Sequence, residues 1–198
     1  MTESGPGSRP DALVASRERL RRLIAEKALV KGEAGSFRLA SGGVSHFFFD
    51  MKMVALDPEG ANLIADLVLE ALGSGDYDHV GGPELGAIPI VAAVATKSFC
   101  ARPMSAFLVR KEPKERGLGK RVEGHLARGA RVALVEDVTT TGGAVLKAVE
   151  AVREEGCTVD KVITVVDRLQ GARERLAERG IDLVSLFTID DFRDELGG

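Results

Sequence analysis

The chain has 198 residues, of which 44% are hydrophobic and 29% charged, with a formal net charge of −3. This length suffices for one domain with a sizeable core, and the composition is that of an ordinary soluble protein. The slightly acidic balance argues against nucleic acid or acidic lipid as a partner of the whole surface, so an anion site has to be a local basic patch. Two cysteines are too few for a disulfide framework, and the longest apolar run, near residues 87–95, is too short to cross a membrane.

The N-terminal quarter is expected to contain a tail, a helix and two short extended segments. Residues 1–10 have no apolar segment of the kind found in signal peptides, which favours a flexible tail and a cytoplasmic protein. An apolar stripe predicts a helix from Asp11 to about Val30. Extended segments are predicted at residues 37–39 and 46–49, joined by a Ser-Gly-Gly turn.

From residue 58 onward, predicted helices and strands alternate, which indicates a mostly parallel sheet with helices on both faces. Helices are expected at residues 58–72, from 87, from 144, at 172–179 and at the C-terminus, and strands at 79–80, 105–109, 132–135, 162–166 and 183–186. Ligands bind such sheets beyond the carboxyl ends of the strands. The segments that follow those ends are therefore expected at one edge: residues 82–86, 110–111, 136–143 and 167–168.

The most informative stretch follows the strand at 132–135. Two carboxylates, Glu136 and Asp137, precede three threonines and two glycines, and a helix follows. Small residues, hydroxyls and the positive end of a helix dipole suit a phosphate group. Carboxylates repel phosphate but accept hydrogen bonds from sugar hydroxyls, so the stretch is interpreted as a receptor for a ribose 5-phosphate. A strand that ends in Asp before a glycine-containing loop is also common in α/β proteins, and this loop is neither a Walker loop nor a dinucleotide fingerprint.

Four other features each have a functional and a structural interpretation. The glycine-rich segment 81–86 is either a tight turn or a second anion cradle, and the basic segment 110–121 is either a solvated loop or a cationic lid. Phe47, Phe48 and Phe49 are core residues by default, although one ring could stack on a flat heterocycle. Arg168 suits either a surface ion pair or bidentate binding of a ligand carboxylate.

The run from Val135 to Gly143 resembles the phosphoribosyl-pyrophosphate (PRPP) motif of type I phosphoribosyltransferases. Residues 37–42 and 45–50 are similar to the hood of the orotate phosphoribosyltransferase family, residues 109–114 to its catalytic loop, and residues 166–172 to its late orotate-contacting strand end. The similarity runs in order from about residue 11 to 190. It implies a type I phosphoribosyltransferase fold as a single domain over residues 11–198, with the hood at about 11–55 and the core at about 56–198.

The resemblance also implies roles for individual residues. Phe48 and Phe49 would flank the orotate ring, and Thr140 and Arg168 would hold its polar edge. The cationic residues Arg110, Lys111 and Lys114 would bind pyrophosphate, some of them in a neighbouring subunit's site, and Glu84 and Leu85 would form the pyrophosphate loop with an unusual, possibly cis, peptide. Glu136 and Asp137 would bind the ribose, with Asp137 also counted among the catalytic residues, and the 5-phosphate loop would comprise Thr139, Thr140, Thr141, Gly142, Gly143 and Ala144.

The implied reaction transfers the phosphoribosyl group of PRPP to N1 of orotate, with Mg²⁺ held mainly by PRPP and no dedicated protein ligand. The sequence has no Ser-His-Asp pattern, which disfavours a covalent intermediate. A homodimer with shared active sites and a decarboxylase partner are further expectations, without nucleic acid or membrane as partners. Three positions depart from the family pattern: Ala40, Arg116 and Gln170. They bear on acid–base work by the catalytic loop and on the fine detail of base selection. Two alternatives remain open: a phosphoribosyltransferase for another base, and a non-catalytic PRPP-sensing regulator.

Overall fold

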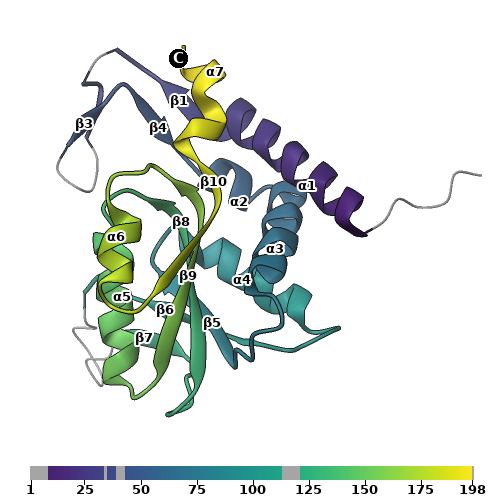
Figure 1. Ribbon diagram of the computed structural model, residues 1–198, viewed down its shortest axis with the longest axis vertical. Coiled ribbons are helices and arrows are strands. Elements are labelled where there is room, and N and C mark those ends of the chain that lie inside the picture. Colours follow the sequence, from purple (N-terminus) through teal and green to yellow (C-terminus); the bar gives the residue numbers. More distant parts are fainter. Residues whose placement is uncertain (1–8, 34, 39–42, 113–120, 198) are drawn as a thin grey trace, which may run out of the picture.

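The computed structural model describes residues 9–33, 35–38, 43–112 and 121–197. Its centre is a six-stranded sheet in the order β10-β9-β8-β5-β6-β7 (Figure 1). The strands are β5 (His79–Pro83), β6 (Ser105–Val109), β7 (Val122–Gly124), β8 (Arg131–Thr139), β9 (Thr158–Asp167) and β10 (Asp182–Thr188). All neighbours are parallel except β6 and β7, so the expected α/β fold with a mostly parallel sheet is confirmed.

Helices cover both faces of this sheet, with α3 (Pro58–Leu72) and α4 (Ala87–Ser98) on one side and α5 (Gly143–Glu154) and α6 (Ala172–Ala177) on the other (Figure 1). The alternation of side chains along β8 divides the core accordingly. Ala133 and Val135 belong to the cluster with α3 and α4, whereas Val132 and Leu134 belong to the cluster with α5. Helix α3 begins as the sequence predicts, with Pro58 in its first turn and a cap at Asp57, whose Oδ1 accepts from Glu59 N at 3.0 Å.

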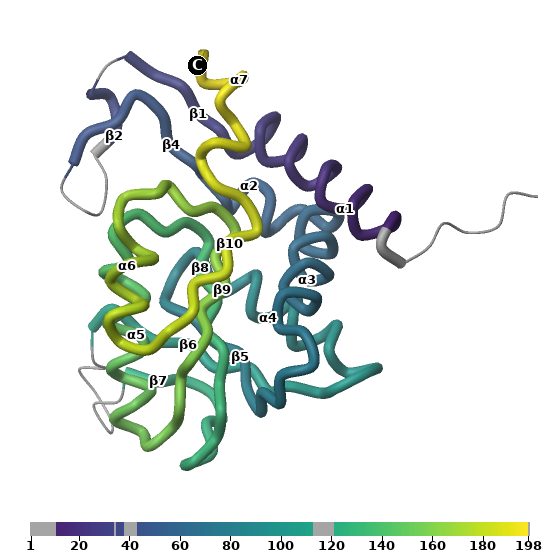
Figure 2. The backbone as a smooth tube through the Cα atoms, viewed as in Figure 1, coloured from purple at the N-terminus to yellow at the C-terminus, as the bar shows by residue number. Residues whose placement is uncertain are grey.

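The N-terminal segments and the C-terminus lie together at one end of the molecule (Figure 2). Their elements are α1 (Arg9–Leu23), a π-helical segment (Ile24–Ala28), β1 (Leu29–Lys31), β2 (Phe37–Arg38), β3 (Val44–Ser45), β4 (Phe47–Phe49), α2 (Lys52–Ala55), a 3-10 turn (Ile189–Phe192) and α7 (Arg193–Leu196). The predicted helix to Val30 is wrong at its end, because β1 pairs antiparallel with β4. The two predicted extended segments do not pair with each other: β2 pairs with β3 instead.

Several strands extend further than the sequence indicates. Strand β8 continues through Glu136 and Asp137 to Thr139, because β9 runs beside it as far as Asp167. Strand β5 likewise includes Gly81 and Gly82, which the sequence places in a loop. A Cβ atom on Gly81 would lie 2.3 Å from the Phe107 ring, and one on Gly82 would lie 2.2 Å from the Val135 carbonyl oxygen, so close packing within the sheet requires both glycines.

The strand order reverses direction between β5 and β8. After β5 the chain adds β6 on one side, then returns to place β8 on the other side of β5. The helices that follow these two strands, α4 and α5, therefore pack on opposite faces of the sheet. In open α/β sheets the strand ends at such a reversal border the crevice in which ligands bind. No helix in the described ranges is long and apolar enough to span a membrane.

Candidate active site

The segments that follow β5, β6, β8 and β9 all lie at the carboxyl edge of the sheet. The register aligns Pro83 with Val109, and Thr139 with Asp167, so these strands end at similar heights. Glu84, Arg110, Thr140 and Arg168 consequently follow neighbouring strand ends. This gathering is what the predicted topology requires, and it surrounds the point between β5 and β8 at which sheets of this kind bind ligands.

The predicted 5-phosphate loop connects β8 to α5. Gly142 has φ = 75°, a left-handed conformation that favours glycine, and its carbonyl accepts from Leu146 N at 2.9 Å. Arg175, on α6, donates from Nη1 to the Thr141 carbonyl at 2.7 Å. Thr139 is buried, and its Oγ1 has no hydrogen-bond partner in the described part of the chain. The segment between β8 and α5 thus has fixed carbonyl groups at Thr141 and Gly142, and the residue that ends β8 has an unsatisfied hydroxyl.

Glu136 and Asp137 lie near the carboxyl end of β8. Glu136 is only 7% exposed, and burial raises the pKa of its carboxyl well above the usual range. The negative charge of Asp137 raises this pKa further, while the charge of Lys111 opposes the shift. Asp137 is partly exposed, and its Oδ1 accepts from Val138 N at 2.9 Å. The two acids therefore differ in solvation, although the resemblance assigns both of them to the ribose.

The loop after β5 begins only at Glu84, and the Glu84-Leu85 peptide is cis, as the resemblance implies. Glu84 ties this loop to the next strand end: its N–H donates to the Val109 carbonyl, and its Oε1 accepts from Lys111 N, both at 2.9 Å. Gly86 packs directly against the acidic pair, because a Cβ there would lie 2.1 Å from Asp137 Oδ2. The loop predicted for pyrophosphate (Glu84 to Gly86) thus contacts both Lys111, at the start of the basic segment, and Asp137, the acid predicted to bind ribose.

The basic segment has both ends fixed. Strand β7, which sequence reasoning missed, pairs antiparallel with β6, and Arg110 N donates to the Arg121 carbonyl at 2.8 Å. Lys114 and Arg116 lie outside the described residues. The missed strand has only three residues with one large apolar side chain, Val122, so its local pattern carries no strand signal.

Arg168 is 6% exposed and reaches from the end of β9 into the hood. Its backbone N–H donates to the Thr139 carbonyl at 2.9 Å, and its Nη2 donates to Ser45 Oγ at 3.0 Å. The guanidinium carbon lies 4.3 Å from the centroid of the Phe47 ring. Nε is buried without a hydrogen-bond partner among the described residues, and burial lowers the pKa of the group. Arginine nevertheless remains a cation at neutral pH.

The three consecutive phenylalanines have different surroundings. Phe48 is 37% exposed and stacks on Phe37 at 6.0 Å between centroids. Phe49 is buried in the core with an edge contact to Phe192, so its role beside a base stays a prediction. Phe47, to which sequence reasoning gave no individual role, lies under Arg168. Of the family departures, Gln170 is exposed and Ala40 lies outside the described residues.

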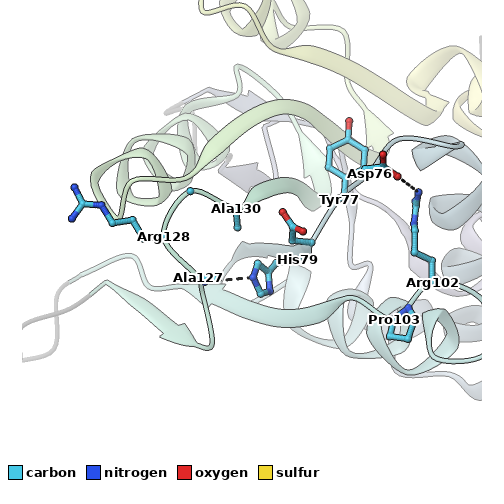
Figure 3. Close-up of a pocket in the computed structure, with 10 residues that line it drawn as sticks. Asp76, Tyr77, His79, Arg102, Pro103, Ala127, Arg128 and Ala130 are labelled. Carbon is cyan, nitrogen blue, oxygen red and sulfur yellow. Dashed lines mark hydrogen bonds and ion pairs between the residues drawn. The ribbon is translucent and has the colours of Figure 1, made fainter.

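The carboxyl edge is distinct from a cavity of about 620 Å³ at the amino ends of β5 and β8 (Figure 3). Arg102 and Asp76 form an ion pair of 3.8 Å there, and the buried His79 accepts from Ala127 N at 3.4 Å. This cavity contains none of the predicted site residues. The described part of the chain also has no group of three or more His, Cys, Asp or Glu side chains that could hold a metal ion.

Comparison with known proteins agrees with this geometry. Residues 53–190 match the family described as the phosphoribosyl transferase domain. The chain is 47% identical over 184 residues to the orotate phosphoribosyltransferase of Rhodopseudomonas palustris (strain BisB5), an alignment that covers 90% of this chain and 96% of the relative.

Solved structures give the same result. The Mycobacterium tuberculosis H37Rv orotate phosphoribosyltransferase in complex with Fe(III) dicitrate has a TM-score of 0.78 at 36% identity. The same enzyme in complex with PRPP has 0.74 at 34%; both cover 89% of this chain and 98% of theirs. Fold and site therefore define a PRPP-dependent transferase. The chain belongs to the phosphoribosyltransferase family and, within it, groups with the orotate phosphoribosyltransferases.

Proposed function

We propose that this protein transfers the phosphoribosyl group of PRPP to N1 of orotate, giving orotidine 5-phosphate and pyrophosphate in pyrimidine nucleotide (UMP) biosynthesis. The observation that carries the proposal lies at the carboxyl ends of β5 and β8, where the loop with the cis Glu84-Leu85 peptide packs against Asp137 and the buried cation of Arg168 follows the neighbouring strand end. The M. tuberculosis relative that binds PRPP has the same fold at 34% identity.

PRPP would be held at three points along this crevice. The loop from Thr139 to Ala144 would receive the 5-phosphate, because its backbone N–H groups and hydroxyls lie at the amino end of α5. Glu136 and Asp137 would accept hydrogen bonds from the ribose hydroxyls. The Glu84-Leu85 loop would receive the pyrophosphate, next to Lys111. Fixing both ends of the sugar in this way places C1 in a defined position for attack.

The reaction would need stabilisation of the departing pyrophosphate more than a covalent nucleophile. Cleavage of the C1–O bond leaves a cationic, oxocarbenium-like sugar and a negative leaving group. Arg110, Lys111 and Lys114 would stabilise the leaving charge, some of them in the site of a neighbouring subunit. A lid that excludes water would strengthen each of these electrostatic interactions.

Mg²⁺ fits the residues of the crevice. Magnesium prefers oxygen ligands and is usually bound by one or two carboxylates together with substrate phosphates and water. The partly exposed Asp137 would offer one carboxylate oxygen, and the ion would be held mainly by PRPP, without a dedicated protein ligand. When bound, Mg²⁺ neutralises charge on the leaving pyrophosphate.

The base would occupy the space between the hood and the end of β9. Arg168 favours an anionic partner, because it is a buried cation with an unused N–H donor. Phe48, Phe49 and Thr140 would complete the site. This preference also supports a second candidate, a transferase for another carboxylated heteroaromatic. It gives no support to a nucleic-acid-binding regulator.

A substrate comparison tests the proposal. With Mg²⁺ and PRPP, we expect pyrophosphate release with orotate and little release with adenine or hypoxanthine. Calorimetry with Mg²⁺ should also detect PRPP binding by the protein alone. Absence of heat at millimolar PRPP would overturn the PRPP site, whereas release with a different acid base would change only the acceptor.

Three further parts of the proposal concern the surroundings of the enzyme. We propose a homodimer with active sites completed across the interface, a cytoplasmic location and cooperation with a decarboxylase that consumes the product. Sedimentation at micromolar concentration tests the dimer. Mixing an inactive Lys111 variant with an inactive Asp137 variant tests shared sites, because activity should return only if one subunit completes the other's site.

A further inference from the structure

Arg168 is held by the hood although it belongs to the core. Its guanidinium has two contacts with the hood, the hydrogen bond from Nη2 to Ser45 Oγ and the face of the Phe47 ring. Ser45 and Arg168 are separated by 123 residues in sequence, and both are at least nine-tenths buried. The contact therefore depends on how the hood packs against the sheet.

The position of Arg168 is costly without a ligand. Burying a cation without a counter-ion is unfavourable, and no ion pair with a carboxylate of the described residues neutralises this one. Burial is the cause that lowers its pKa. Among the described residues only weak partners compensate, a hydroxyl oxygen and an aromatic face. An anion placed at Nε would satisfy both the unpaired charge and the unpaired donor.

Ser45 is itself fixed by the hood backbone. The N–H of Phe47 donates to Ser45 Oγ at 3.2 Å, so the hydroxyl oxygen accepts both from this backbone group and from Arg168. Strand β4, which begins at Phe47, is anchored by its pairing with β1. A continuous series of contacts thus runs from the β4 backbone through Ser45 to the guanidinium.

We propose that Ser45 and Phe47 are positioning residues that hold Arg168 with its Nε–H directed to the acidic group of the base. The inference rests on the proposed function for the identity of that base. Ser45 accepts from Nη2, which leaves the unpaired Nε–H as the donor for an oxygen of the acidic group. The two residues set the affinity for orotate and leave the affinity for PRPP unchanged.

The test uses two serine variants from the hood. Ser45→Ala removes the acceptor of Arg168. Ser36→Ala is a matched control, because Ser36 Oγ donates to the Glu33 carbonyl at 2.7 Å, within its own turn. In the full-length enzyme we expect Ser45→Ala to raise the KM for orotate about tenfold, as for loss of one hydrogen bond to a charged group. The calorimetric Kd for PRPP should stay the same. Ser45→Thr keeps the hydroxyl and should restore the KM, and Phe47→Leu should raise it with the fold retained.

A second readout does not depend on catalysis. The ¹⁵N resonance of the Arg168 Nε–H, identified by its loss in Arg168→Lys, should move in Ser45→Ala and stay in place in Ser36→Ala. An unmoved resonance, or an unchanged KM for orotate, would overturn the positioning role. Equal weakening of orotate and PRPP, with a lower Tm, would also overturn it in favour of a general role in hood stability. Wild-type protein inactive with orotate would overturn the proposed function, and the resonance test would still decide the positioning of Arg168.

Discussion

Gly86 and Asp137 are in contact across the crevice, so that a Cβ on Gly86 would lie 2.1 Å from Asp137 Oδ2. Gly86 has φ = −63° and ψ = −34°, angles that any residue adopts, so its backbone does not require glycine. Glycine is required here because a side chain would collide with the Asp137 carboxylate. The contact therefore sets the distance between the loop predicted for pyrophosphate and the acid predicted to bind ribose.

Gly86→Ala is expected to displace the Asp137 carboxylate and weaken PRPP binding. Overpacking of this kind costs about 1–3 kcal/mol, and the same loss in binding free energy corresponds to a Kd for PRPP raised roughly five- to 150-fold. Calorimetry with Mg²⁺ measures the Kd. In an Asp137→Ala background the added methyl meets no carboxylate, so the unfolding penalty of Gly86→Ala should largely disappear. Equal penalties in the two backgrounds would refute the contact as its cause.

Glu136→Gln is expected to stabilise the empty protein at high pH. The folded-state pKa of Glu136 is raised, so its contribution is most favourable below the ordinary glutamate pKa and is lost as the pH rises through the folded value. The advantage of glutamine should therefore be small near pH 4 and grow towards pH 8, to roughly 1–3 kcal/mol. Urea unfolding at both pH values measures it. Glu154→Gln, an exposed control on α5, should show no such growth.

Lys111→Ala is expected to lower kcat about a hundredfold with the fold intact, a loss on the order of 3 kcal/mol of transition-state stabilisation. The hydrogen bond from this residue to Glu84 uses the backbone N–H, so removal of the side chain leaves the loop contact in place. Steady-state kinetics with saturating PRPP and orotate give kcat, and circular dichroism monitors the fold. Lys97→Ala, on the outer part of α4, serves as the control. Normal turnover in Lys111→Ala would remove this lysine from the mechanism.

Arg175→Ala is expected to loosen the 5-phosphate loop, because Thr141 loses the donor that holds its carbonyl at 2.7 Å. Loss of about 1 kcal/mol predicts a KM for PRPP raised roughly fivefold, with a smaller change in kcat. Arg173→Ala is the matched control from the same helix, since its guanidinium donates to Ser185 Oγ at 3.4 Å and leaves the loop alone. Similar kinetics for the two variants would contradict a specific role for Arg175.

The parts of the fold that follow local pattern were predictable from the sequence. Helix α3 and strand β6 have the predicted bounds, and the alternation of elements gives the parallel sheet. Strand β1 was not predictable, since its residues continue a helical stripe and become extended only because β4 lies beside them. The same reason applies to β7, which exists as the partner of β6.

The site shows the same division. The carboxyl edge was predictable, because parallel strands bring the segments after them to one side of a sheet. The contact of Arg168 with Ser45 and Phe47 was not, because it joins segments more than 100 residues apart and no local pattern records it. The contact between Gly86 and Asp137 was not predictable for the same reason, although the two residues lie in the predicted segments 82–86 and 136–143.

The reversal of strand order between β5 and β8 has an electrostatic consequence. Helices α4 and α5 pack on opposite faces of the sheet, yet each begins just after the carboxyl end of one of two adjacent strands, β5 and β8. Two backbone dipoles thus add positive potential at one place in a protein whose net charge is −3. Peptide groups do not titrate, and no side-chain replacement removes them. Part of the electrostatic attraction for a polyanion therefore comes from the backbone dipoles of α4 and α5 and does not depend on side chains.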